Sequence, residues 1–310
     1  MKIKSLYLDN VGNFEDFTLD FENSRNAIFG QNGIGKTTIL NSIATFFYHK
    51  GRTKKFPLFY KNEFENDTSS LKLNIEYYNP SLEADSLLSE EDRKITQELS
   101  NKDEKYKDIL KKLNNETDGK IIYFTSHRFF SEEHAIPQAE LKKDSWILQV
   151  YDQKSTSFNS PNEIHEYIIY NELGKGLNLL YTKNEDTMVD STLKDLINNA
   201  FHDKEFKEVR NQNAVFEVVF KNKTNDKEFT LFDLSHGEKQ LLTFIVEFHK
   251  HKWNNSVIMI DEPEMSLHPD WQTKLIPLLQ TLGENNQFII ATHSQEIIYS
   301  FDENEVMYLG

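Results

Sequence analysis

The apolar positions near the start of the chain alternate with polar ones, as they do in β-strands that bury one face. After Gly30, the apolar residues instead recur at the three- and four-residue spacing of a helix. The pattern therefore predicts strands up to Gly30, with an N-terminal antiparallel β lobe, and then a helix from about Lys36. The strand positions are Ile3, Leu6, Leu8, Phe17, Leu19, Phe21 and 27–29, and the helix positions are Ile39, Leu40, Ile43 and 46–47.

Towards the end of the chain, apolar runs of strand length alternate with amphipathic segments of helix length. The run Val257–Ile260 has four consecutive apolar residues, which is typical of a central strand buried on both faces. Strands that alternate with helices form a parallel sheet, so we expect the α/β class, with a mainly parallel sheet flanked by helices. The predicted elements are helices at 235–251, 269–282 and 294–300, and strands at 256–260, 287–291 and 305–309.

The segment 83–118 is strongly charged and carries only a thin apolar stripe. This pattern predicts a helix or a short helical hairpin that projects from the body, and a solvated surface helix is the alternative. The apolar stripe consists of Ile95, Leu99, Tyr106, Ile109, Leu110 and Leu113.

The rest of the middle predicts further insertions into a single unit that spans 1–310. A helical lobe is expected at 125–233, between the first helix and the helix at 235–251. Its predicted parts are helices near 161–182 and 190–202 and a hairpin of Val215–Phe220 with Phe229–Phe232 around Asn222–Asp226, and outside it strands are predicted at 71–77 and 121–124.

Charge and composition narrow the classes of function. The chain has 310 residues, with 35 Lys and Arg against 50 Asp and Glu, and a formal net charge of −15. This balance argues against a protein that coats nucleic acid through bulk charge. Cysteine is absent, so there is no disulfide and no thiolate ligand or nucleophile. No apolar run approaches the roughly 18 residues of a membrane-spanning helix, so we expect a cytoplasmic protein without a membrane segment.

The turn after the predicted strand at 27–29 matches the Walker A pattern, Gly30-x4-Gly35-Lys36-Thr37. A strand, a glycine-rich turn and a helix are the context in which backbone N–H groups wrap a phosphate. Lys36 is expected to reach the β- and γ-phosphates, and Thr37 to ligate Mg²⁺. The expected nucleotide-binding positions are Gly30, Asn32, Gly33, Gly35, Lys36, Thr37 and Thr38.

The apolar run Val257–Ile260 ends in two carboxylates, Asp261 and Glu262, which is the Walker B pattern. Ligands of open α/β sheets bind at the carboxyl ends of the strands. We therefore expect Asp261 to hold Mg²⁺ and Glu262 to polarise or deprotonate the attacking water. For this segment alone, an ordinary strand end with two exposed carboxylates is the alternative.

Two further motifs, LSHGE and ATHS, complete the set. The spacing Ser235-x-x-Glu238 is a capping box, which predicts that Ser235 caps the helix at 235–251. The same segment resembles the signature motif of ABC ATPases. His293, which follows the last apolar strand but one, resembles their switch histidine.

With these four motifs in this order, the chain resembles the soluble ABC ATPases of the SMC, RecF and OLD group. The resemblance implies a P-loop NTPase fold of ABC type with ATP and Mg²⁺ as ligands. It implies that Ser235 and Gly237 contact the γ-phosphate bound to a second copy, that His293 senses that phosphate, and that Asn13 and Phe14 lie near the adenine.

Two departures from this group leave roles open. The sequence EPEMSLHP suggests that 266–268 forms the D-loop at a dimer interface, but His268 stands where the family usually has an aspartate. Where the family's Q-loop glutamine is expected, the chain has His127 and Arg128. Arg128 is either a phosphate contact, a contact that couples the lobes, or a surface residue.

Small heads with this opening, LSxGE and EPExxLHP resemble the ATPases of bacterial anti-phage systems of the retron and Septu types. That resemblance implies an ATP-dependent homodimer that controls a separately encoded nuclease or toxin. The alternatives are a repair head of RecF or SMC type that reads DNA directly, and an ATP-gated scaffold without hydrolysis, which Glu262 argues against. The basic run His49–Lys55 is the candidate DNA contact, and a solvated loop is its bland interpretation.

Overall fold

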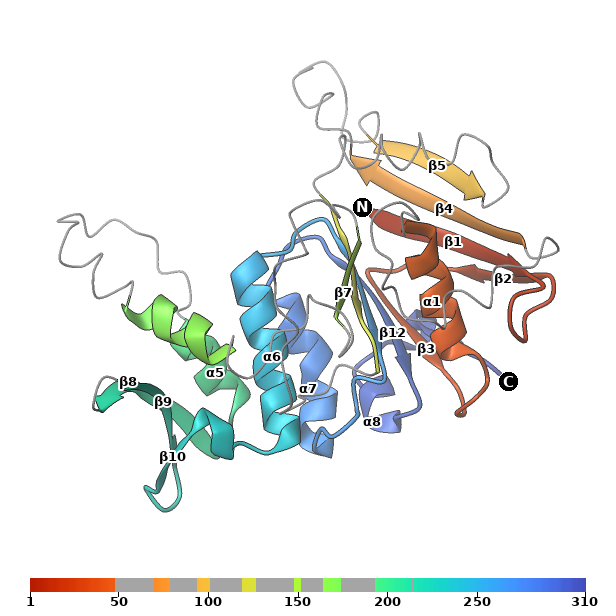
Figure 1. The fold of residues 1–310 in the computed structure, drawn as a ribbon. Helices are drawn as coiled ribbons and strands as arrows, with labels where there is room; N and C mark the ends of the chain where they lie inside the picture. The colour runs from red at the N-terminus through yellow and green to blue at the C-terminus, as the bar shows by residue number, and fades with distance from the viewer. Residues whose placement is uncertain are drawn as a thin grey trace.

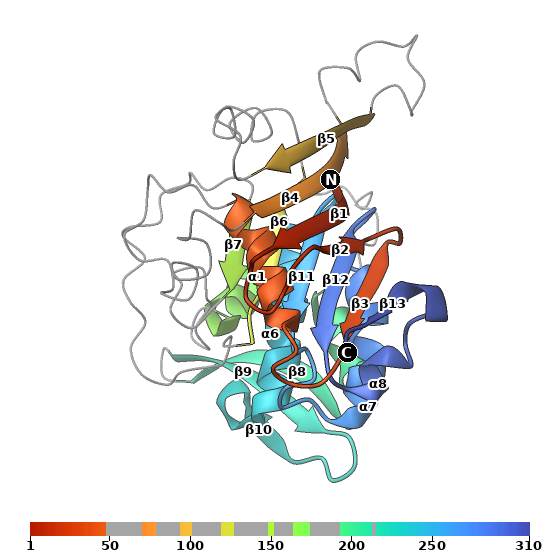
Figure 2. The same cartoon turned by 90° about the vertical axis from the view of Figure 1, so that its right-hand side faces the viewer.

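In the computed structural model, the described residues form three β-sheets together with the helices that pack on them (Figure 1). Two antiparallel sheets lie on opposite sides of a larger central sheet, as the two views in Figures 1 and 2 show. The structure describes residues 1–47, 70–78, 94–100, 119–126, 148–151, 164–173, 193–212 and 215–310.

The central sheet has six strands, and every neighbouring pair is parallel. Successive side chains of a strand point to opposite faces, so this sheet joins two cores. Met259 packs into one core, and Ile258 and Ile260 pack into the other. The strand order is β13 (Val306–Tyr308), β3 (Arg25–Phe29), β12 (Gln287–Thr292), β11 (Val257–Asp261), β6 (Ile121–Phe124) and β7 (Leu148–Tyr151).

Helices cover the two faces of the central sheet unequally. The helix α1 (Lys36–Phe47) packs in the core on one face, and α6 (His236–His251), α7 (Pro269–Gln280) and α8 (Gln295–Ile298) pack in the core on the other (Figure 1). All four were predicted from the apolar spacing. In the part of the chain that the structure describes, no helix combines the length and apolar character that crossing a bilayer requires.

The N-terminal sheet is antiparallel, as predicted, and is fixed to the central sheet by a buried glutamine. Gln287, at the start of β12, accepts from the backbone N–H of Ile3 at 2.7 Å and donates to the Ile3 carbonyl at 2.9 Å. These two bonds pair both the oxygen and the nitrogen of the buried amide. The strand order of this sheet is β2 (Phe17–Asp20), β1 (Lys2–Asp9), β4 (Ser70–Tyr78) and β5 (Lys94–Ser100).

The prediction of a helix over 83–118 is wrong at Lys94–Ser100, which forms the strand β5. In this strand Ile95 and Leu99 stand opposite Tyr77 and Leu73 of β4. Their spacing fits one face of a strand as well as it fits a helix, and pairing with the free edge of β4 decides between the two. The other residues of the predicted arm lie outside the described residues.

The lobe before α6 contains a third, antiparallel sheet. The hairpin predicted around Asn222–Asp226 is confirmed, and the helices predicted near 161–182 and 190–202 are present at 164–173 and Leu193–Ala200 (α5). The strand β8 was not predicted, because its alternation is weak and its face is mostly charged. The strand order is β10 (Glu228–Thr230), β9 (Val215–Asn222) and β8 (Lys204–Gln212).

Candidate functional site

The phosphate-binding loop connects β3 to α1, and the Phe14 ring packs against it at Gly35. Gly35 has a φ of 110°, and a Cβ there would lie 2.7 Å from the Phe14 ring, so only glycine fits. Lys36 is buried, and its ammonium donates to the carbonyls of Gly30 and Gln31 at 2.8 and 2.9 Å. The Lys36 ammonium is therefore held inside the loop, at the N-terminus of α1, where anions bind.

The Walker B strand brings a carboxylate to this loop. Asp261 is fully buried at the carboxyl end of β11, and Thr37, the second residue of α1, donates its hydroxyl to Asp261 Oδ2 at 2.9 Å. The two residues are 224 positions apart in the chain. The fold thus places next to each other the two side chains that the sequence predicted as magnesium ligands.

Glu262 follows Asp261 in an unusual backbone conformation. Its φ is 47°, in the left-handed region that non-glycine residues seldom adopt. Its backbone N–H donates to the Ala291 carbonyl at 2.8 Å, so β12 holds the turn in place. Strained backbone of this kind clusters at functional sites, and here it directs a partly exposed carboxylate away from the buried strand.

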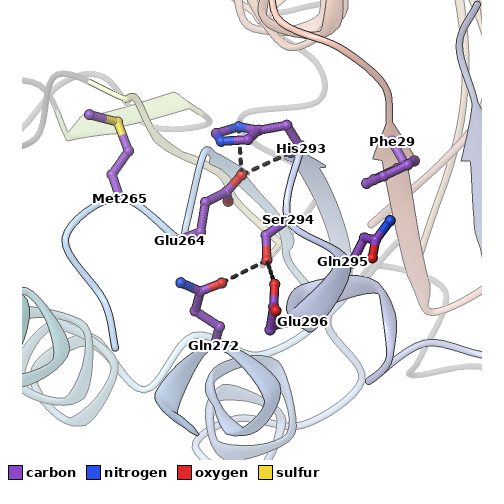
Figure 3. Close-up of a pocket in the computed structure, with 8 residues that line it drawn as sticks. All are labelled: Phe29, Glu264, Met265, Gln272, His293, Ser294, Gln295 and Glu296. Carbon is purple, nitrogen blue, oxygen red and sulfur yellow. Dashed lines mark hydrogen bonds and ion pairs between the residues drawn. The ribbon is translucent and has the colours of Figure 1, made fainter. Parts of the chain in front are cut away.

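The imidazole of His293 lies between two carboxylates. His293 Nδ1 is 3.9 Å from Glu262 Oε1 and 3.0 Å from Glu264 Oε1. Glu264 is buried, and the same oxygen accepts from Thr292 Oγ1 and from the His293 backbone N–H, both at 2.8 Å. Figure 3 shows the contacts of Glu264 with His293. Glu264 was not among the residues predicted from the motifs. The available signal was a second carboxylate two residues after the Walker B pair.

An open pocket of about 590 Å³ lies beside this histidine (Figure 3). Ser294 Oγ in its wall is 2.6 Å from Gln272 Oε1 of α7 and 3.0 Å from Glu296 Oε2. Gln272 also donates to the Leu267 carbonyl at 2.9 Å. The turn after the Walker B strand and the turn after β12 are therefore tied together through α7.

The signature segment caps α6 as its spacing predicted. Ser235 Oγ accepts from the Glu238 backbone N–H at 3.4 Å, and Glu238 Oε2 accepts from the Ser235 N–H at 2.8 Å. A Cβ on Gly237 would lie 2.1 Å from the Ser266 carbonyl oxygen. Glycine is therefore required at 237 by contact with the chain's own 262–268 turn, which the sequence did not indicate.

Lys204 of β8 forms an ion pair with the buried Glu238. Burial disfavours the charged ammonium, but hydrogen bonds to Glu238 and Asp203 outweigh it and raise the pKa of Lys204. The start of α6 therefore carries a carboxylate whose charge is matched by a lysine from the third sheet.

The chain that forms this site matches a known protein family. The family model AAA_21, described as "AAA domain, putative AbiEii toxin, Type IV TA system", matches residues 25–298. This match spans most of the chain and every part of the site from β3 to α8. The chain belongs to the AAA_21 family.

Two curated relatives match nearly the whole AAA_21 chain. Septu protein PtuA from Bacillus thuringiensis is 25% identical over 323 residues, covering 99% of this chain and 76% of PtuA. A protein from Escherichia coli named "Retron Ec83 probable ATPase" is 21% identical over 397 residues, covering 100% of this chain and 71% of the relative. The resemblance to P-loop ATPases of the retron and Septu types is confirmed.

A solved structure supports the same fold for this AAA_21 chain. An SMC head bound to the C-winged helix domain of ScpA matches with a TM-score of 0.54 and 14% identity, covering 99% of this chain and 94% of that chain. At this identity the likeness concerns the fold alone. It confirms the predicted P-loop NTPase architecture of ABC type, with a parallel sheet flanked by helices and an N-terminal antiparallel lobe.

The donor set of the AAA_21 site fits a magnesium nucleotide. Mg²⁺ prefers oxygen ligands, and it is usually held by one or two protein side chains together with water and phosphates. The Thr37 hydroxyl and the Asp261 carboxylate supply such oxygens. Within the described residues, no group of three or more His, Cys, Asp and Glu could hold a metal on its own. The phosphates of a bound nucleotide would supply further oxygen ligands.

The remaining residues that were predicted to bind the nucleotide or DNA differ in their exposure, and some lie outside the described residues. Asn32 and Gly33 are exposed in the loop, and Asn13 is exposed in the β1–β2 turn, where its neighbour Gly12 packs on Thr38. Phe14 is buried against Gly35, so its ring supports the loop, and its position near an adenine stays a prediction. His127, Arg128 and the basic run His49–Lys55 lie outside the described residues.

His268, whose role was left open, caps α7. Its Nδ1 accepts from the Asp270 backbone N–H at 3.3 Å, and Pro269 follows it at the first helical position. Its side chain is two-thirds exposed, at 67%. The capping bond accounts for a polar residue at 268 without a ligand.

Proposed function

We propose that this chain is an ATP-hydrolysing switch in which two copies close on ATP and Mg²⁺. One observation carries the proposal: Thr37 of the phosphate loop donates to Asp261 at 2.9 Å, beside the buried Lys36. A hydroxyl, a carboxylate and an ammonium converge from two separate segments at the carboxyl edge of a parallel sheet. That arrangement suits a nucleoside triphosphate with its Mg²⁺ ion better than any other ligand class.

Each residue has an assigned part in the proposed reaction. Lys36 leaves the Gly30 and Gln31 carbonyls and binds the β- and γ-phosphates, while Thr37 and Asp261 hold Mg²⁺, which neutralises phosphate charge when bound. Glu262 accepts the proton of the attacking water. His293, which lies next to Glu262, contacts the γ-phosphate.

The signature segment is proposed to act on the other copy. The helices α1 and α6 lie on opposite faces of the central sheet, and Ser235 and Gly237 begin α6. A helix N-terminus is an anion-binding element through its dipole and the N–H groups of its first turn. In a sandwich of two copies, Ser235 and Gly237 of one copy would face the γ-phosphate held by Lys36 of the other.

We propose that the nucleotide state is reported to a separately encoded effector, a nuclease or toxin, in anti-phage defence. The support is the similarity to Septu protein PtuA and to the retron Ec83 ATPase over almost the whole chain. The runner-up is a head that reads DNA directly, through the run His49–Lys55.

Steady-state ATPase activity of the purified chain tests these proposals, with Glu262→Gln as the blank. We expect turnover that Glu262→Gln abolishes and that double-stranded DNA leaves unchanged. Stimulation by DNA that falls as salt rises would instead favour the DNA-reading alternative. Equal activity of the chain and the blank would show that Glu262 is not the residue that activates water.

A further inference from the structure

Glu264 is the feature of the site that the proposed reaction leaves unused. We propose that Glu264 is a positioning residue: it holds the His293 imidazole with its proton on Nδ1 and leaves Nε2 to meet the phosphate or water. This inference rests on the proposed function, because it gives His293 its working orientation.

The Glu264 carboxylate is held rigidly by its hydrogen bonds. Its Oε1 accepts two hydrogen bonds of 2.8 Å, from the Thr292 hydroxyl and from the His293 backbone N–H, the second of which is drawn in Figure 3. Both donors belong to the end of β12 and the turn after it. A carboxylate with two fixed donors on one oxygen has little freedom to rotate, so the atom facing His293 Nδ1 is fixed.

The negative charge of the buried Glu264 carboxylate also favours the contact with His293. Glu264 Oε2 is buried and makes no hydrogen bond, and among the described residues the ion pair of this carboxylate is the one with His293. A buried carboxylate without a matched partner is costly, so the nearby imidazole has a stabilising role for Glu264 as well. The two side chains therefore form a mutually dependent pair.

The same contact determines which nitrogen of the neutral His293 ring carries the proton. A lone pair on Nδ1 would face a carboxylate oxygen at 3.0 Å and be repelled, whereas an N–H there is attracted. With the proton on Nδ1, the neutral ring offers Nε2 as an acceptor. The protonated ring offers Nε2–H as a donor to an anion. In both states Glu264 determines which nitrogen is available, as partners of functional histidines commonly do.

NMR of the full chain with ¹⁵N-labelled histidine tests the pair without any need for catalysis. The His293 signals are assigned by their loss in His293→Gln. We expect the Nδ1–H tautomer in the unmodified protein and a shift towards Nε2–H, the form favoured by an unconstrained histidine side chain, in Glu264→Ala. Glu264→Gln retains an acceptor oxygen, so it should keep the Nδ1–H tautomer and guards against a variant that fails to fold.

Glu296→Gln is the matched control, because it removes a carboxylate that accepts from neighbouring Ser294. We expect unchanged His293 signals in that variant. An Nε2–H tautomer in the unmodified protein, or signals that Glu264→Ala leaves unchanged, would overturn the proposal.

Turnover supplies the second measurement. We expect Glu264→Ala to lower kcat by about 10- to 100-fold, the range typical of lost orienting partners, with the Kd for Mg·ATP changed by less than about 2-fold. An unchanged kcat would overturn the positioning role. A chain that lacks ATPase activity altogether would refute the proposed function, while the NMR result would still decide the Glu264–His293 pair.

Discussion

Glu262, the proposed acceptor of the water proton, has a strained backbone. Its φ of 47° is costly for a residue with a Cβ, by about 1 kcal/mol or more relative to glycine. The surrounding turn maintains the strain through the bond from its N–H to Ala291. Selection of a strained glutamate over a relaxed glycine is the pattern expected where the side chain is needed.

This strain gives a prediction that separates stability from activity. We expect Glu262→Gly to be more stable than Glu262→Ala by about 1 kcal/mol in the free energy of unfolding, because only alanine keeps the Cβ penalty. Both variants should lack hydrolysis. Urea denaturation with matched m-values measures the difference. An alanine variant as stable as the glycine variant would contradict the strain assigned to this position.

At the residue scale, motifs identified side chains but not their contacts. The sequence indicated Lys36, Thr37, Asp261, Glu262 and His293, and the structure gathers them at one edge of the sheet. Glu264 was missed, because nothing in its spacing shows that the turn after β11 brings it back against the turn after β12.

At the element scale, the sheet β8–β9–β10 carries an exposed network of charges. Hydrogen bonds from Lys207 and Arg210 lower the pKa of Glu228 from 4.5 to about 2. A carboxyl whose pKa is lower in the folded state stabilises the fold fully above the unfolded value and loses that effect as pH falls towards the folded value.

The network therefore predicts a defined pH dependence. The difference in unfolding free energy between the unmodified chain and Glu228→Gln should be largest above pH 4.5 and shrink as pH falls from 4.5 to about 2. Denaturant titrations at pH 7 and pH 3 compare the two proteins. Since the groups are exposed, 1 M salt at pH 7 should also reduce the difference, and a difference insensitive to both changes would argue against the network.

Elements with strong periodicity were predicted well, and those set by pairing were not. The capping box and length of α6 followed from Ser235, Glu238 and the apolar spacing after them. The strand β5 did not, since Ile95 and Leu99 fit either period. The conformation of β5 is decided by its pairing with the edge of β4 that β1 leaves open, and β4 lies outside the segment 83–118.

At the scale of the whole molecule, α1 and α6, the two helices proposed to bind phosphate, lie on opposite faces of one sheet. The helix α1 packs with the N-terminal sheet, and α6 packs with α5 and α7. Their N-termini both open at the carboxyl edge of the strands. This division is what a composite site shared between two copies requires, and it gives a direct test.

Mixing two inactive variants tests the shared site. Lys36→Ala should fail to bind nucleotide, and Ser235→Arg should block closure on the partner's phosphate. We expect each alone to lack ATPase activity, and a mixture to recover part of it, because a mixed dimer contains one site with both Lys36 and Ser235 intact. A mixture as inactive as its components would place both residues in the same site of one copy.

The sequence by itself determined the class of the fold and the phosphate chemistry. Apolar periodicity fixes strands and helices locally, and the glycine spacing before Lys36 specifies a phosphate loop with few alternatives. The tertiary structure alone decided which distant residues meet: Thr37 with Asp261, and His293 with Glu264. These contacts depend on the order of parallel strands and on the turns at their ends, which arise from long-range packing rather than from local spacing.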